Sequence, residues 1–287
     1  ERYVGDTAID ENWKPRFEIN PTNKRILVIG GGPSGLSAAY HLVRQGHTVE
    51  LYESGSELGG LMRTGIPSYR LPRRILDAEI NRIIDMGVTV KLNYKVTDVL
   101  KEKEAGKFDA VYVSVGSQMI RKENIEEENP IPIIDAFTFL KESETAKSVR
   151  GKRIVVYGGG KLAMYLSRII KRMGAEAIVL FPGDRKSMPA YDYEADDAIE
   201  EGVDIQFLQK INKISMHKFT LEKMKIEKSK PVGTGEYSTI EGDMLILALA
   251  QESDTAFLRN IPNVTVNDDG TVVVGADRMT KHEGIYA

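Results

Sequence analysis

The stretch KRILVIGGGPSGLSAAYHLVRQGHTVELYES, residues 24–54, decides the fold of this chain. It opens with an apolar run at 26–29 that suits a strand buried on both faces. A glycine turn, a helix that begins near Pro33 and a second strand at 49–52 come next, and Glu53 ends that strand. This order predicts the strand–helix–strand unit of an α/β fold.

The glycine turn has the spacing of a dinucleotide-binding motif. Gly30, Gly32 and Gly35 form G-x-G-x-x-G, which allows a tight turn, close approach of backbone to a pyrophosphate and close packing of helix on strand. The helix points its N-terminal N–H groups at that phosphate. Glu53 stands about 20 residues further on, where a carboxylate accepts hydrogen bonds from adenosine ribose hydroxyls. The alternative is a glycine-rich turn that binds nothing, but the full strand–helix–strand context favours a nucleotide site.

Composition excludes several classes of function. The 287 residues suffice for two domains, and a formal charge of −3 with a pI near 6.0 gives no basic surface for nucleic acid. No apolar run approaches the roughly 20 residues that a membrane span needs. No signal peptide is visible, so we expect a cytoplasmic protein, although a chain that opens at Glu1 without Met could have lost a leader.

Cysteine is absent from the sequence. Its absence removes redox-active thiol pairs and thiolate-bound zinc or iron–sulfur clusters from this chain. The four histidines are scattered, at His41, His47, His217 and His282, so no metal site is expected.

The opening unit recurs later in the chain. Residues 152–182, KRIVVYGGGKLAMYLSRIIKRMGAEAIVLFP, align with 24–54 without a gap at an offset of 128. The paired turn residues are Gly30 and Gly158, Gly32 and Gly160, and Gly35 and Ala163. Such a repeat predicts an α/β chain with two Rossmann-like dinucleotide-binding domains, and two nucleotides brought end to end for electron transfer.

The second unit lacks the acidic residue. Phe181 stands where Glu53 stands in the first unit, which removes a group that would repel a 2′-phosphate. Arg185 and Lys186 would then favour NADPH. Asp184 could instead serve a ribose hydroxyl, so NADH stays open.

The second turn also differs in the residues that follow its glycines. Lys161 and Leu162 occupy these places, and a lysine there either contacts phosphate or occludes it. The alternative for this unit is a degenerate domain that keeps the fold and binds no nucleotide.

Other segments supply the remaining elements. A locally basic loop at 55–76 contains Gly59 and Gly60, which suit close approach of backbone to a ligand, and we expect its Arg73 and Arg74 to be solvated. An acidic helix start within 191–202 is also expected to be a solvated face. Further expected elements are a short helix within 1–13 with Tyr3, Val4 and Ala8 on one side, helices at 75–86 and 135–141, strands at 88–92, 110–115, 203–207, 244–249 and from 285, hairpins over 211–240, and a turn between two strands at 269–270.

These segments together resemble a known family. GGGPSGLSAAYHLVRQGHTVELYE, GGLMRTGIPSYRLP, VYVSVGS, GGGKLAMY, MPA, EEGV and ILALAQ occur in this order. The set resembles the small (beta) subunit of glutamate synthase and the flavin/nucleotide portion of dihydropyrimidine dehydrogenase, over nearly all of the chain. The most specific part is GGL-x-R-x-GIP-x-x-RLP at 59–72.

The resemblance implies FAD in the first unit and NADPH or NADH in the second. It implies a second domain inserted in the first: an arm at 1–23, an FAD-binding domain at 24–117 plus 251–287, and an NAD(P)-binding domain at 118–250. The FAD contacts that it implies are Gly30, Gly32, Pro33, Ser34, Gly35, Glu53, Gly60, Leu61, Arg70 and the backbone of Val96. Gly116 would lie at the crossing between the domains, and Gly158, Gly160 and Ala163 would form the second nucleotide's turn.

Three departures from the family concern the second nucleotide alone. The family often has Asn/Asp-Thr-Ala-Met-Asp where this chain has 161–165, KLAMY. Pro182 and Gly183 replace a basic pair, and Ala250 replaces a glycine. In the family a cysteine-rich iron–sulfur segment precedes this region, and an Ala-Gly-Asp that contacts the flavin follows it.

The expected activity is transfer of a hydride from NAD(P)H to FAD, then of electrons to iron–sulfur clusters on a partner or another segment. The cofactors carry this chemistry, so no catalytic side chain is nominated. The alternatives are an FAD-only electron relay with a structural second domain, and a non-catalytic scaffold core.

Overall fold

The chain divides into two compact units. The computed structural model describes residues 1–287 except 1, 15–16, 121–122, 124 and 144–148. The first unit comprises Glu1–Met119 with Glu252–Ala287, and the second comprises Ile120–Gln251. The predicted division at 117–118 and 250–251 lies close to these bounds, whereas the cofactor of each unit stays a prediction.

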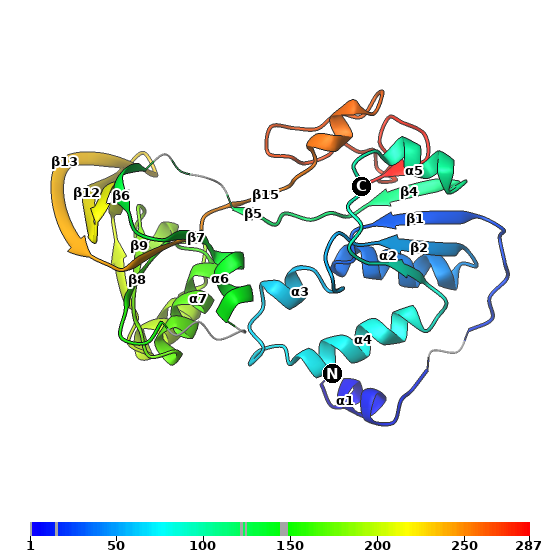
Figure 1. The fold of residues 1–287 in the computed structure, drawn as a ribbon, viewed down its shortest axis with the longest axis horizontal. Coiled ribbons are helices and arrows are strands. Elements are labelled where there is room, and N and C mark those ends of the chain that lie inside the picture. Colours follow the sequence, from blue (N-terminus) through cyan, green and yellow to red (C-terminus); the bar gives the residue numbers. More distant parts are fainter. Residues whose placement is uncertain (1, 15–16, 121–122, 124, 144–148) are drawn as a thin grey trace. The chain divides into compact units, whose positions relative to one another are not determined.

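The first unit is built on a five-stranded parallel sheet (Figure 1). Its order is β16-β4-β1-β2-β3, with β1 Arg25–Ile29, β2 Thr48–Tyr52, β3 Thr89–Lys91, β4 Ala110–Val113 and β16 Ile285–Tyr286. β1 pairs with both β2 and β4, and Ile29 aligns with Tyr52 and Val113, so these strands end at one edge. β16 returns from the end of the chain to complete this sheet, which confirms the insertion of the second domain in the first.

Both faces of this sheet are covered. α2 (Pro33–Arg44) and α4 (Arg73–Ile84) bury Leu36 and Leu76 against Val28 on one face. α5 (Val99–Ala105) and the 3-10 turn η2 (Ala256–Asn260) bury Val99 and Leu258 against the other. β1 is therefore buried on both sides, as its apolar run predicts. The remaining helices of this unit are α1 (Arg2–Asp10) and the short α3 (Leu61–Thr64).

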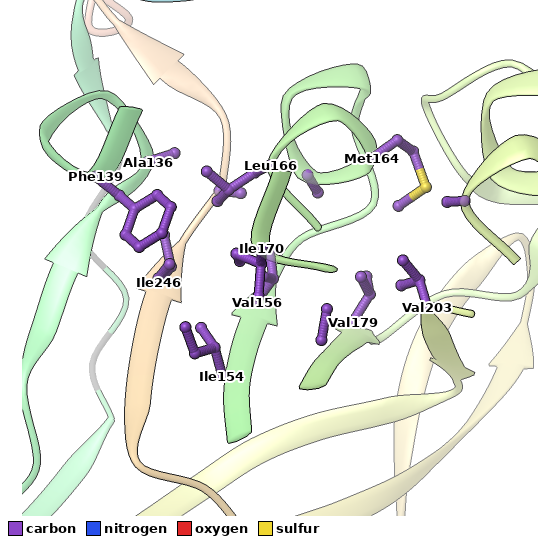
Figure 2. Packing of buried hydrophobic residues seen from close by; sticks show 14 of the residues in the cluster. Ala136, Phe139, Ile154, Val156, Met164, Leu166, Ile170, Val179, Val203 and Ile246 are labelled. Atoms are coloured by element: carbon purple, nitrogen blue, oxygen red, sulfur yellow. The ribbon is translucent and has the colours of Figure 1, made fainter. Parts of the chain in front are cut away.

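The second unit repeats this plan. Its parallel sheet has the order β10-β9-β8-β14-β7, with β7 Ile133–Asp135, β8 Arg153–Tyr157, β9 Glu176–Phe181, β10 Asp204–Phe207 and β14 Met244–Leu247. Its helical elements are α6 (Ala136–Ser143), α7 (Lys161–Arg172), η1 (Arg185–Ser187) and α8 (Asp192–Glu200). Figure 2 shows Met164 and Ile170 of α7 with Phe139 of α6 over Val156 and Ile246 of the sheet. The structure thus confirms two Rossmann-like units.

A second sheet packs on the other face of the parallel sheet in the second unit. Its order is β13-β12-β11-β6, with β6 Glu126–Pro130, β11 Gln209–Met216, β12 Lys218–Glu227 and β13 Lys230–Glu241. Phe219 and Leu221 of β12 are buried in one cluster with Val155 and Tyr157 of β8. The hairpins predicted over 211–240 are confirmed. The short strands β5 (Met119–Ile120) and β15 (Gln251–Glu252), where the chain passes between the units, pair with each other.

The short helix predicted within 1–13 forms as α1, with Tyr3 and Val4 exposed and Ala8 buried. Two other local predictions were wrong. At 269–270 a turn forms, but Val266 and Val272 make an isolated bridge where two strands were expected. The acidic segment 191–202 is not simply a solvated face, because Glu194 is 1% exposed and its carboxylate accepts hydrogen bonds from the Tyr165 hydroxyl and the Tyr191 N–H.

Glu201 makes the acidic segment a source of pH dependence. Arg172 and Arg168 donate to its two carboxylate oxygens at 2.9 and 2.8 Å. These hydrogen bonds, Arg172 first, outweigh partial burial and lower the pKa of Glu201 from 4.5 to about 2. The resulting stabilisation is complete above pH 4.5 and is lost as the pH falls toward 2.

We therefore expect Glu201→Gln to lower the melting temperature at pH 7 by roughly 3 °C, and by progressively less below pH 4.5. Differential scanning calorimetry from pH 7 to pH 3 measures this. Glu200→Gln, at the exposed neighbouring position, is the control. A Glu201→Gln difference that stays constant over this range would contradict the assignment.

Candidate functional site: two glycine turns

The first glycine turn joins β1 to α2 through very close backbone contacts. Gly30 has φ +102°, and a Cβ there would lie 2.4 Å from the Ser114 carbonyl oxygen. A Cβ on Gly35 would lie 1.9 Å from the Gly30 carbonyl oxygen. Only glycines permit this approach of helix to strand, as the sequence predicts.

Gly32, in contrast, has room for a Cβ without a close contact. It is the N-cap of α2, and a Cβ there would meet only the Gly60 Cα, at 3.9 Å. α2 has no side-chain cap and Pro33 is its first residue, so its first-turn N–H groups are available to an anion. The approach of a diphosphate to the backbone of Gly32 stays a prediction.

The loop at 59–60 packs directly on this turn. The Gly59 N–H donates to the Gly31 carbonyl at 2.8 Å. Gly60 has φ +50°, and a Cβ there would lie 2.8 Å from the Gly32 Cα. The close approach that the two glycines predict is thus made to the first turn itself. A contact of Gly60 with FAD stays a prediction.

Glu53 follows β2 directly and is held in place by backbone donors. Its Oε2 accepts the Gly31 N–H at 2.7 Å, and its Oε1 accepts the Gly55 N–H at 2.7 Å and the Ser54 hydroxyl at 3.1 Å. A carboxylate has about four acceptor sites, so capacity for a ribose hydroxyl remains.

The other residues predicted for the first site lie in the same unit. Ser34 is exposed to solvent. Gly116 has φ +69°, and a Cβ there would meet no atom within 4 Å. Leu61 begins α3 and Arg70 is exposed. The Val96 side chain is 5% exposed within the core, which leaves its backbone as the group able to face a ligand.

Two polar residues near this turn were missed by sequence reasoning. The Ser114 hydroxyl donates to the Ile29 and Gly30 carbonyls at 2.9 and 3.1 Å and so fixes the turn. The Tyr112 hydroxyl lies 2.8 Å from the Ser34 hydroxyl. Tyr112 lies in β4 and Ser114 directly follows that strand, and nothing in the local sequence marks them.

The arginines of the 55–76 loop differ from one another. The Arg73 guanidinium donates to the Ile66 carbonyl at 3.2 Å and is half-buried, so the prediction that it is solvated was wrong. Arg74 is exposed, as predicted. Like Arg73, Arg63 bonds within the protein: its guanidinium donates to the Leu58 carbonyl at 2.7 Å and pairs with Asp77.

The second glycine turn has the same local geometry. Gly158 has φ +142°, and a Cβ there would lie 2.1 Å from the Ala248 carbonyl oxygen. Gly160 is the N-cap of α7, and a Cβ there would meet no atom within 4 Å. Ala163 is fully buried and Leu162 packs against the same core, so these two side chains hold α7 on the sheet. A nucleotide contact of Leu162 or Ala163 stays a prediction.

Two charged residues of the loop after β9, Asp184 and Arg185, contact other groups of the protein. A Cβ on Gly159 would lie 2.6 Å from the Phe181 ring, which fills the side of the turn that Glu53 occupies in the first unit. Asp184 accepts the Ser187 N–H and hydroxyl, which lower its pKa. Arg185 pairs with Asp196 and Asp192 of α8. Lys186, the other residue of the predicted basic pair, is exposed.

Lys161 has an aromatic partner that sequence reasoning missed. Its ammonium nitrogen lies 3.9 Å from the centroid of the Tyr191 ring. Tyr191 stacks on Tyr193 with ring centroids 5.6 Å apart, and both rings are exposed. The signal in the sequence was only the aromatic pair inside an acidic segment.

Comparison with known proteins identifies the fold family. The family described as "Pyridine nucleotide-disulphide oxidoreductase" matches residues 24–287. The chain belongs to this family. Although the family's name refers to disulphides, this chain contains no cysteine. No dithiol in this chain therefore receives electrons.

Relatives within the family confirm the resemblance to glutamate synthase small subunits. The chain is 32% identical over 222 residues to "Glutamate synthase [NADPH] small chain" of Escherichia coli (strain K12), covering 72% of this chain and 47% of that one. It is 32% identical over 302 residues to "NADP(+)-dependent formate dehydrogenase subunit beta" of Moorella thermoacetica, covering 96% and 42%. The chain thus spans less than half the length of these relatives.

Solved structures agree with the fold. The structure entitled "Mycobacterium tuberculosis FprA in complex with NADPH" superposes with a TM-score of 0.74 at 17% identity, over 92% of this chain and 78% of that one. The thioredoxin reductase of T. acidophilum gives 0.71 at 15% identity, over 92% and 89%. Within the described residues, no helix is long and apolar enough to cross a membrane, and no group of acids and histidines could hold a metal ion.

Two substitutions in the first turn separate folding from nucleotide binding. Gly35→Ala places a methyl group against the Gly30 carbonyl, and we expect a loss of about 1–3 kcal/mol in the free energy of unfolding. Gly32→Ala places it at ordinary contact distance from the Gly60 Cα, and we expect little change in the unfolding of the FAD-free protein but at least about tenfold weaker FAD binding. Denaturant unfolding and FAD titration measure both effects. Equal FAD affinity in Gly32→Ala and the parent would show that no diphosphate lies beside Gly32.

Proposed function

We propose that the chain is an NADPH-dependent flavoprotein oxidoreductase module that passes electrons to an iron–sulfur carrier. The observation that carries this proposal is the pair of glycine turns, which are alike in backbone geometry but differ in the acid at the end of the second strand. Two such turns on one chain serve two nucleotides. The family match supports their use for electron transfer.

The first unit suits FAD. The space beside Gly32 and the uncapped N-terminus of α2 would hold the diphosphate, and Glu53, fixed by the Gly31 N–H, would hold the adenosine ribose. FAD bound there would supply the hydride-accepting chemistry. The protein's part is to bind and orient it, and no acid, base or nucleophile of this chain is required.

The second unit suits NADPH. The space beside Gly160 at the N-terminus of α7 would take the diphosphate. Phe181 presents no carboxylate to repel a 2′-phosphate, and Arg185 and Lys186 lie in the loop that follows. The printed names of several relatives also specify NADPH or NADP(+).

The acceptor is proposed to lie outside this chain. Without cysteine the chain offers no thiol pair and no thiolate cluster site, so electrons leave the flavin for an iron–sulfur subunit or a further segment. A relative of 30% identity from Geobacter sulfurreducens is named "NADPH-Fe(3+) oxidoreductase subunit beta", which supports outward transfer. A cytoplasmic location is part of this proposal.

A visible spectrum before and after each reductant tests the proposal. We expect the purified protein to carry or take up FAD, and anaerobic NADPH to bleach the flavin band faster than NADH does. FAD absorbance without bleaching by either nucleotide would instead support an FAD-only relay with a structural second domain. Colourless protein that also fails to take up added FAD would support a scaffold core.

A further inference from the structure

Lys161 differs from the other charged groups around the second turn in the kind of partner it has. It is the first residue of α7 and is exposed, and its ammonium lies 3.9 Å from the Tyr191 ring centroid. Across the described part of the chain it has no carboxylate within ion-pair distance, whereas Arg185 is paired with Asp196 and Asp192. The aromatic face therefore positions Lys161 without neutralising its charge.

Tyr191 is firmly anchored beside the turn. Its N–H donates to the Glu194 carboxylate at 3.1 Å, and the other oxygen of Glu194, which is 1% exposed, accepts the Tyr165 hydroxyl at 2.8 Å. The preceding residue, Ala190, donates its N–H to the Gly159 carbonyl at 3.0 Å. The backbone that carries the Tyr191 ring is thus tied to the glycine turn, although the ring itself is 55% exposed.

We propose that Tyr191 is a positioning residue that holds the Lys161 ammonium at the second glycine turn, where Lys161 binds the diphosphate of the nicotinamide nucleotide. This rests on the proposed function, because it assumes that a nucleotide binds beside Gly160. Lys161 is one residue from that open space, at the positive end of α7. A lysine stem loses much rotamer entropy when it is ordered, and a ring that orders it beforehand reduces the loss on binding.

The opposite role for Lys161 is occlusion of the turn. A blocking lysine and a binding lysine predict opposite signs for its removal. Truncation of a blocking side chain would tighten nucleotide binding, and truncation of a binding one would weaken it. The direction of the change therefore decides between them.

Calorimetric titration of the FAD-loaded protein with NADP⁺ tests the inference. We expect Lys161→Ala to raise Kd by about tenfold or more and to flatten its dependence on salt, because a charged hydrogen bond to phosphate is lost. Tyr191→Leu should raise Kd by about two- to fivefold, the size of an exposed cation–π contact, and Tyr191→Phe should restore the parent value. Tyr193→Leu is the matched control, since Tyr193 stacks on Tyr191 but does not carry the lysine.

The outcomes separate this inference from the proposed function. If the parent protein binds no NADP⁺, the nucleotide site and the inference fail together. If the parent binds it and Lys161→Ala or Tyr191→Leu leaves Kd unchanged, or Lys161→Ala tightens it, only the inference is overturned. An equal rise in Tyr193→Leu and Tyr191→Leu, or no recovery in Tyr191→Phe, overturns it as well. Thermal melts of each variant confirm that the fold is intact.

Discussion

The backbone contact between each glycine turn and the neighbouring strand is the constraint on which both sites depend. Gly30 lies so close to the Ser114 carbonyl, and Gly158 so close to the Ala248 carbonyl, that a Cβ would lie 2.4 or 2.1 Å from an oxygen. This contact fixes the angle at which α2 and α7 leave the sheet. It leaves each helix N-terminus, which no side chain caps, at a glycine where a Cβ would make no close contact, Gly32 and Gly160.

The parts of this fold that the sequence predicts are those set by local spacing. The apolar run before the first turn, the glycine spacing and the repeat at 152–182 each specify short segments, and the structure has the expected strands and helices there. The position of Glu53 followed in the same way, because it directly follows the strand that pairs with β1. Such features need no knowledge of distant residues.

The residues that sequence reasoning missed act across long separations. Ser114 fixes a turn 84 residues earlier in the chain, and Tyr112 reaches Ser34 across 78. Arg73 and Glu194 were expected in solvent because their segments are rich in like charge, yet each is held by polar groups in a folded environment. Pairings of this kind depend on tertiary packing, which composition and periodicity do not encode. The difference between the two turns, Glu53 in one and Phe181 with Lys161 in the other, fits a division of labour between flavin and nicotinamide.

We expect a nicotinamide nucleotide bound by the second unit to reduce FAD bound by the first. Anaerobic stopped-flow mixing of the FAD-loaded protein with NADPH, and with NADPH carrying deuterium at the transferred position of C4, tests it most directly. We expect the flavin to bleach, and to bleach more slowly with the deuterated nucleotide. A flavin that stays oxidised in excess NADPH and in excess NADH would contradict it.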